Sequence, residues 1–239
     1  MNRRWPLAAF ALLAALGAVA RPGYAQGSTP YERMAPLAQY LIPDRATEIA
    51  LARSAAPPAI SMHAKVMVLT ARGYETPEAG TNGFTCLVER AWMKSFDDQG
   101  FWSTKFRAPV CYNPVASRSV LPYTLFRTGL VLAGASKTEI LKRVEAAVGS
   151  QLPGFEAGSM AYMMSKEQYL TDDGRPSWHP HVMFYAPKAA GADAGSDWGA
   201  DRAGSPVIFD TSGRILPEPW ALFFVPVSHW SDGSLAPAA

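Results

Sequence analysis

Two histidines separated by a single proline are the feature of the sequence that most directly suggests chemistry. His179 and His181 flank Pro180 within the stretch RPSWHPHVMFYAP. On a β-strand both imidazoles project from the same face, because side chains alternate with a period of two. Such a pair can bind zinc or copper once one or two further ligands join it. The candidates for those further ligands are His63, His229, Asp172 and Asp173.

A second interpretation of the two histidines needs no metal. No acidic side chain follows His181 within the strand-like stretch, so the ligand set is incomplete. Trp178 to Pro180 would then form the turn into a strand, and both histidines would hydrogen-bond locally or face water. We expect this second arrangement, with a strand that runs to about Tyr185. Its alternation predicts two sides, with His181, Met183 and Tyr185 on one and Val182 and Phe184 on the other.

The two cysteines suggest another chemistry. Cys86 precedes His181 in the chain, and this order is similar to that of papain-like cell-wall amidases and peptidases. In such enzymes a histidine keeps the thiol deprotonated and the thiolate attacks a carbonyl. However, Cys86 lies in strand-like sequence, and the chain has a second cysteine, Cys111. An even number of cysteines in an exported chain predicts a structural disulfide between Cys86 and Cys111.

The first 25 residues have the pattern of a signal peptide. A basic start is followed by an apolar run over residues 7–20, and Gly23 and Ala25 fit a cleavage site after Ala25. The run is shorter than the roughly 20 residues that cross a bilayer as a helix. No later segment is long and apolar enough to do so. We therefore expect a periplasmic or secreted protein with no transmembrane segment in the mature chain.

The net charge argues against nucleic acid as a partner. The whole chain has a formal charge of +2, but the leader contributes Arg3, Arg4 and Arg21 without any acid. The remainder is close to neutral and has no basic stripe. Proteins that bind nucleic acid need such a stripe to neutralise phosphates.

The order of the periodic segments predicts an α+β fold: a single domain with a mainly antiparallel sheet and with N-terminal and central helices. We expect a signal peptide over residues 1–25, a linker over 26–30, the domain over 31–232 and a flexible tail over 233–239. Helices are predicted over 31–42, 44–56, 114–121, 123–134 and 136–149, the last with a capping box of Ser136 and Glu139. The first two strands, 63–70 and 84–92, are expected to pair antiparallel across a long loop. Further strands are predicted over 159–165, 181–187, 206–210 and 220–228, with a mobile loop over 189–204.

Several stretches of the sequence also support a resemblance. EIALARSAAPPAIS, GTNGFTCLVERAW, PVCYNP, MAYMMSKEQYL and WHPHVMFY together resemble an uncharacterised family of bacterial secreted proteins. The resemblance covers most of the chain, from Glu32 to Trp230, and implies a single exported domain. It implies no activity, ligand or site.

These observations favour a protein of the cell envelope that acts as a binding or structural module, with an envelope ligand or protein as its partner. The alternative is a hydrolase that uses either a metal site of His179 and His181 or a thiol pair of Cys86 and His181. The sequence suggests no cofactor other than zinc or copper at that metal site. Which of the two classes applies depends on whether the histidines border a cavity.

Overall fold

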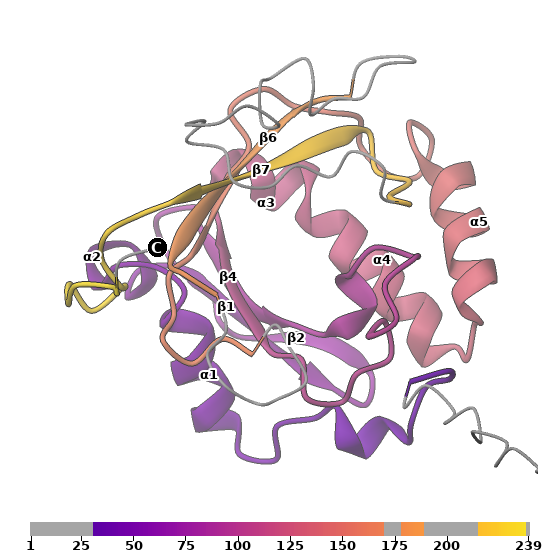
Figure 1. Cartoon of the computed structure of the whole chain (residues 1–239), viewed down its shortest axis with the longest axis horizontal. Helices are drawn as coiled ribbons and strands as arrows, with labels where there is room; N and C mark the ends of the chain where they lie inside the picture. Colours follow the sequence, from indigo (N-terminus) through magenta and orange to yellow (C-terminus); the bar gives the residue numbers. More distant parts are fainter. Residues whose placement is uncertain (1–30, 170–177, 189–214, 238–239) are drawn as a thin grey trace, which may run out of the picture.

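The protein is built around one β-sheet. A computed structural model describes residues 31–169, 178–188 and 215–237, and in these ranges seven strands form a single sheet in the order β2-β1-β3-β4-β5-β6-β7 (Figure 1). They are β1 (Lys65–Thr70), β2 (Gly73–Glu78), β3 (Thr85–Glu89), β4 (Ala108–Tyr112), β5 (Met160–Met163), β6 (His181–Pro187) and β7 (Trp220–Pro226). Neighbouring strands are antiparallel except for β1 and β3, which are parallel. Together with the helices, this mainly antiparallel sheet confirms the predicted α+β class.

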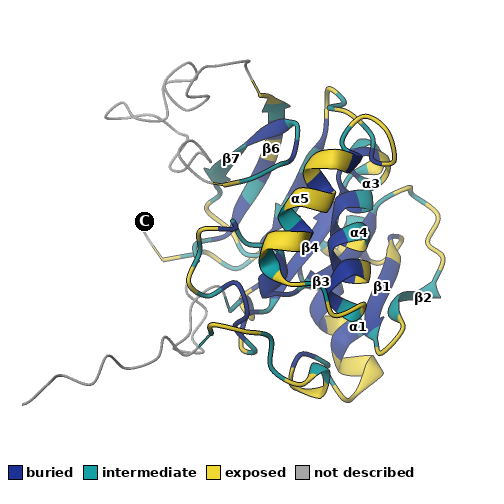
Figure 2. Cartoon of the chain, turned by 90° about the vertical axis from the view of Figure 1, so that its right-hand side faces the viewer, coloured by how far each residue is buried: buried dark blue, intermediate teal, exposed yellow. Residues whose placement is uncertain are grey.

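Helices cover both faces of the sheet. They are α1 (Arg45–Arg53), α2 (Pro58–Ser61), α3 (Pro114–Ser119), α4 (Leu121–Leu132) and α5 (Lys137–Ala147), with short 3₁₀ turns η1 (Leu37–Gln39) and η2 (Ala91–Met93). α1 packs on β1, β3 and β4 from one side. α3, α4 and α5 stand together in front of these strands in Figure 2, where the strands are mostly buried. The central strands therefore have no solvated face.

The alternation of side chains in β3 and β4 gives each face its own core. Cys86, Val88 and Cys111 pack with residues of α1 such as Leu51 and Ala52. The alternate positions belong to the second core, which lies against α3 to α5 and contains Leu87, Val110, Tyr112, Leu121, Tyr123 and Val131. Burial on both faces explains why β4 and the middle of β3, residues 86–88, are hydrophobic at successive positions.

The helix ends follow local sequence signals. The side chain of Asp44 accepts hydrogen bonds from the backbone amides of Ala46 and Thr47, so it caps α1. At the start of α5 the capping box predicted from Ser136 and Glu139 is present in both directions. Each cap satisfies amides that the first helical turn leaves without a partner.

The prediction of a helix over residues 31–42 is wrong. Only the single 3₁₀ turn Leu37–Gln39 forms, after Pro36, whose ring nitrogen has no hydrogen to donate. Tyr40 follows this turn and is fully buried. Its hydroxyl donates to the carbonyl of Trp102 at 2.7 Å. A distant contact, and not helical propensity, fixes the conformation of this segment.

The antiparallel hairpin predicted for the first two strands is also wrong. Residues expected to be loop form β2, which pairs with one side of β1, and β3 lies parallel to β1 on the other side. The chain passes the start of β1 at Gly80, which has a φ of +68°. A Cβ at Gly80 would lie 2.1 Å from the backbone nitrogen of Lys65, so only glycine allows this close crossing.

One strand escaped prediction. β4 lies between β3 and β5, but it contains Pro109, which cannot donate to a ladder and so argues against a central strand in the sequence. Other predicted segments, namely 1–25, 26–30, 189–204 and 206–210, lie outside the described residues. Within the described ranges, no helix has the length and apolar character needed to cross a membrane.

A buried ion pair joins the N-terminal half of the domain. Arg90 directly follows β3 and is fully buried, and its Nη2 donates to Oε1 of Glu48 in α1 at 2.9 Å. The same Oε1 accepts the backbone N–H of Leu69 in β1 at 3.0 Å. Arg90 also donates through Nε to the carbonyl of Tyr40 at 2.7 Å and through Nη1 to that of Val88. One charge pair thus connects four segments.

Breaking this pair from the carboxylate side should destabilise the domain strongly. Glu48→Gln leaves the guanidinium of Arg90 buried without a counter-charge, and such losses cost about 3–5 kcal/mol. Chemical denaturation should show the decrease in the free energy of unfolding. The matched control is Glu75→Gln, which removes the carboxylate of the exposed pair with Arg72 and should change stability by less than about 0.5 kcal/mol. Equal effects of the two substitutions would contradict the role assigned to Glu48.

Candidate functional site

A cavity of about 340 Å³ lies between α4 and one face of the sheet, and the last two strands, β6 and β7, form part of its wall. Half of the described lining residues have aromatic or thioether side chains, including Tyr112, Tyr123, Met163, Met183, Tyr185 and Trp220. Cavities that bind small molecules have this composition, with a few polar groups among apolar walls, and begin at about this size. This is the candidate functional site.

Contacts between aromatic rings link two walls of the cavity. Trp220 at the start of β7 lies edge-on to Tyr123 of α4, with ring centroids 4.6 Å apart. It also lies edge-on to Tyr185 of β6, at 5.7 Å. Trp220 therefore bridges the far strands and the helix layer, which belong to distant parts of the sequence.

Glu89 provides one carboxyl group of the cavity wall. It is the last residue of β3, and it points to the same face as Leu87 because the two are separated by one position. Its Oε1 accepts hydrogen bonds from the hydroxyls of Tyr112 on β4 and Thr124 on α4, the latter at 3.0 Å. The side chain keeps partial exposure, which we attribute to the cavity that it lines. Burial raises the pKa of Glu89, and the two hydroxyls and Arg127 only partly oppose the rise.

A second carboxyl group, that of Glu218, lines the same cavity. Glu218 precedes β7 and forms an ion pair with Arg127 of α4, at 2.6 Å between Oε1 and Nη2. Arg127 is fully buried, and its Nη1 donates to the carbonyls of Trp92 and Lys94, both at 3.1 Å. Burial lowers the pKa of Arg127, while Glu218 and Glu89 raise it. The pair holds the approach to β7 against α4.

His181 is buried and its hydrogen bond goes to the backbone. It starts β6 directly after Pro180, is fully buried and forms a hydrogen bond through Nδ1 with the carbonyl of His179 at 2.9 Å. Its ring packs on Phe224 and Trp178, with centroids 5.0 and 5.8 Å away. Burial lowers the pKa of His181 to about 4, so the imidazole is neutral at pH 7.

The predicted sides of this strand are confirmed. Met183 and Tyr185 are buried with His181, whereas Val182 is half-buried and Phe184 is exposed. His179 lies before the strand and is half-buried. Neither histidine is among the residues that line the cavity.

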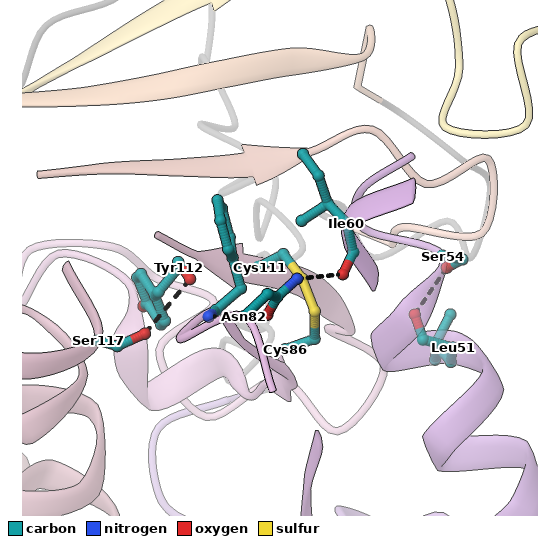
Figure 3. The surroundings of a disulfide bond; sticks show 9 residues. Leu51, Ser54, Ile60, Asn82, Cys86, Cys111, Tyr112 and Ser117 are labelled. Carbon is teal, nitrogen blue, oxygen red and sulfur yellow. Dashed lines mark hydrogen bonds between the residues drawn. A yellow bond between two sulfur atoms is a disulfide. The ribbon is translucent and has the colours of Figure 1, made fainter. Parts of the chain in front are cut away.

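The predicted disulfide joins β3 to β4. Cys86 and Cys111 are directly opposite in the antiparallel register, with their Cα atoms 4.0 Å apart, and the structure links them. Figure 3 shows the bridge beside Asn82, whose side-chain amide donates to the carbonyl of Ile60 at 2.8 Å. Both cysteines are fully buried in the core beneath α1. The bridge thus fixes the register of two central strands.

The structure does not bring together the groups of the two predicted hydrolase sites. Cys86 lies on the α1 face of the sheet, and His181 lies on the other face three strands away, or roughly 14 Å at the usual strand spacing. Among residues 31–169, 178–188 and 215–237, no three histidine, cysteine or acidic side chains are placed to share a metal ion. Asp172 and Asp173 lie outside these ranges. His63 is exposed, and His229 bonds to the hydroxyl of Ser228.

Sequence reasoning missed the polar residues of the cavity. Glu89, Thr124 and Glu218 come from three separate segments and show no shared motif. One signal was available for Glu89: it occupies the same side of its strand as Leu87, where an apolar residue is expected. An acidic residue at an inward strand position is a candidate for a functional carboxyl group.

Removal of the disulfide should lower stability. Cys86→Ala should reduce the free energy of unfolding by about 2–5 kcal/mol, because the reduced unfolded chain gains conformational freedom. Denaturation with and without reductant provides the measurement. Reductant should weaken the wild type to a similar extent and leave the variant unchanged. Two alkylatable thiols in freshly exported protein would contradict the prediction.

The buried His181 should make the protein sensitive to acid. The folded pKa of about 4 lies below the unfolded value of 6.5, so the unfolded state binds the proton more readily. The contribution of the neutral imidazole to the free energy of unfolding is complete above pH 6.5. It is lost as the pH falls towards 4, and the total loss is on the order of 3 kcal/mol. Urea denaturation at a series of pH values should show a shallower decrease for His181→Gln. The exposed control, His63→Gln, should follow the wild type, and a His181→Gln curve parallel to the wild type would refute the assignment.

Comparison of the chain with models of known protein families, with curated proteins and with solved structures found no match. What the protein binds must therefore be inferred from the cavity itself.

Proposed function

We propose that this protein is an exported binding module that holds one small, largely apolar molecule in the cavity between β4 to β7 and α4. The observation that carries the proposal is the cavity of about 340 Å³ with aromatic walls and a carboxyl group at its edge. A fully packed domain interior leaves few voids larger than a water molecule. A space of this size with mainly apolar walls is suited to a small ligand.

The composition of the wall supports binding in preference to the two hydrolase alternatives. None of Cys86, His179 and His181 lines the cavity. Aromatic rings and methionines present large, adaptable apolar surfaces, which provide affinity for a small molecule without a reactive group.

Two features support export. Residues 1–25 have the signal-peptide pattern, and a disulfide between buried cysteines is typical of proteins that fold outside the reducing cytoplasm. The same compartment gives access to small molecules of the envelope or the medium.

Filling the cavity should prevent binding. Leu222 on β7 lines the cavity, and Leu222→Trp would place a larger ring in it. The neutral fluorophore N-phenyl-1-naphthylamine should bind the wild type saturably with one site. The variant should bind it at least about tenfold more weakly, because occupying a filled site costs about 1–3 kcal/mol of overpacking.

The matched control is Phe184→Trp on the neighbouring strand. Phe184 is 46% exposed and lies on the opposite face of the sheet, so its replacement should leave the affinity for the fluorophore unchanged. Absence of saturable binding to the folded wild type, or equal affinities for the two variants, would refute the proposed function.

A further inference from the structure

Only one of the two carboxyl oxygens of Glu89 accepts hydrogen bonds from other side chains of the protein. Both hydroxyls that reach it, those of Tyr112 and Thr124, donate to Oε1. Neither of these contacts reaches Oε2, and this atom is not one of the fully buried polar atoms without a partner. It is therefore accessible from the cavity that Glu89 lines. Oε2 is therefore the oxygen that remains available to a molecule in the cavity. It would accept a hydrogen bond from that molecule or, when protonated, donate one.

In the described part of the chain, the two cationic side chains near the cavity are each paired with a carboxylate. Arg127 bonds to two backbone carbonyls and pairs with Glu218. Its Nε is buried without a hydrogen-bond partner, but Arg127 is not a lining residue. Lys94 does line the cavity, but its Nζ pairs with Asp98 at 3.3 Å. Within the described ranges two polar atoms of lining residues are buried without a hydrogen-bond partner, the acceptor Oε2 of Glu218 and the donor Nε1 of Trp178. The charged groups of the described lining are nevertheless mostly acceptors. Glu89, Asp98 and Glu218 contribute three carboxyl groups, against the single ammonium group of Lys94.

Aromatic rings surround this acceptor-rich region. The hydroxyl of Tyr112 donates to Glu89. Burial raises the pKa of Tyr185, and the nearby carboxyl groups of Glu89 and Glu218 raise it further. Burial likewise raises the pKa of Tyr123, with a further contribution from Glu218. Trp220 lies edge-on to Tyr123 and Tyr185. Carboxylate oxygens combined with the electron-rich faces of aromatic rings are the environment that an ammonium group prefers.

We propose that the cavity selects a small amphipathic amine, whose ammonium group donates to Oε2 of Glu89 while its apolar body packs against the aromatic wall. This inference rests on the proposed binding function and adds the chemical class of the ligand. A matched alcohol has the same apolar body but no charge, so it should bind in the same place with lower affinity.

The affinity for an amine should depend on pH, because it depends on the ionisation of Glu89. The groups that act on Glu89 are Tyr112, Thr124, Arg127, Glu218 and Tyr185. Burial raises the pKa of Glu89, whereas an ammonium group bound beside it would stabilise the carboxylate and lower that pKa, so amine binding is linked to loss of a proton from Glu89. Amine affinity should therefore increase with pH through the titration of Glu89, and binding should release protons. Alcohol affinity should not change with pH.

Calorimetric titration of the full mature chain with three matched pairs tests the inference: butylamine and butanol, 2-phenylethylamine and 2-phenylethanol, tryptamine and tryptophol. For at least one pair the amine should bind about tenfold or more tightly at pH 7.5, the size expected of a desolvated cation with a carboxylate and aromatic rings. Repeating the titration in buffers of different ionisation enthalpy should reveal the released proton. The carboxylate 3-phenylpropionate should bind most weakly.

Glu89→Gln should abolish the preference for amines and the proton release while leaving alcohol affinity within about twofold of wild type, since glutamine keeps the shape of the side chain. Glu156→Gln, which alters an exposed carboxylate that pairs with Arg118, is the control and should retain both effects. Thermal denaturation verifies that each variant is folded.

The possible failures are distinguishable. If amine and alcohol bind equally, or the carboxylate binds best, the inference is overturned and the proposed binding function stands. If neither these compounds nor the neutral fluorophore binds the folded wild type, the proposed function itself fails. The wild-type preference at different pH values decides the inference even if Glu89→Gln does not fold.

Discussion

The domain depends on a guanidinium that is held entirely away from water at the end of β3. Arg90 needs a counter-charge and several acceptors in that position, because an unpaired buried charge is very costly. Glu48 supplies the charge, and the carbonyls of Tyr40 and Val88 supply further acceptors. These contacts order the N-terminal segment, α1 and the central strands together. Since Arg90 directly follows Glu89, they also fix where the cavity carboxyl group is presented.

A second buried guanidinium plays the corresponding part on the other face. Arg127 joins α4 to the segment before β7 through Glu218, and to the turn after β3 through two backbone carbonyls. The cavity lies where these parts converge. Ion pairs of this kind contribute little net stability compared with apolar packing, but they specify one arrangement of segments. Of the two pairs, only the one between Arg127 and Glu218 reaches the cavity wall, through Glu218.

Local periodicity was enough to predict several elements. β6 covers residues 181–187 as expected. Its alternation places His181 on the buried side with Met183 and Tyr185, because successive side chains of a strand point to opposite faces. The capping box of α5 and the disulfide were likewise predictable from residue types and spacing. The failures were long-range in origin. β2 forms because β1 offers it an edge, β4 is buried despite Pro109, and Tyr40 draws residues 37–39 into a 3₁₀ turn where a longer helix was expected.

The candidate site shows the same division more sharply. By itself the sequence determined which residues face together within each strand, where α5 begins, and that two cysteines were available to pair, since these follow from backbone geometry over a few residues. Tertiary structure alone decided that Glu89, Thr124 and Glu218 share a cavity and that Cys86 and His181 lie on opposite faces. The meeting of distant segments is set by the packing of whole layers and by buried charges that must find partners. No pattern within a single segment contains that information.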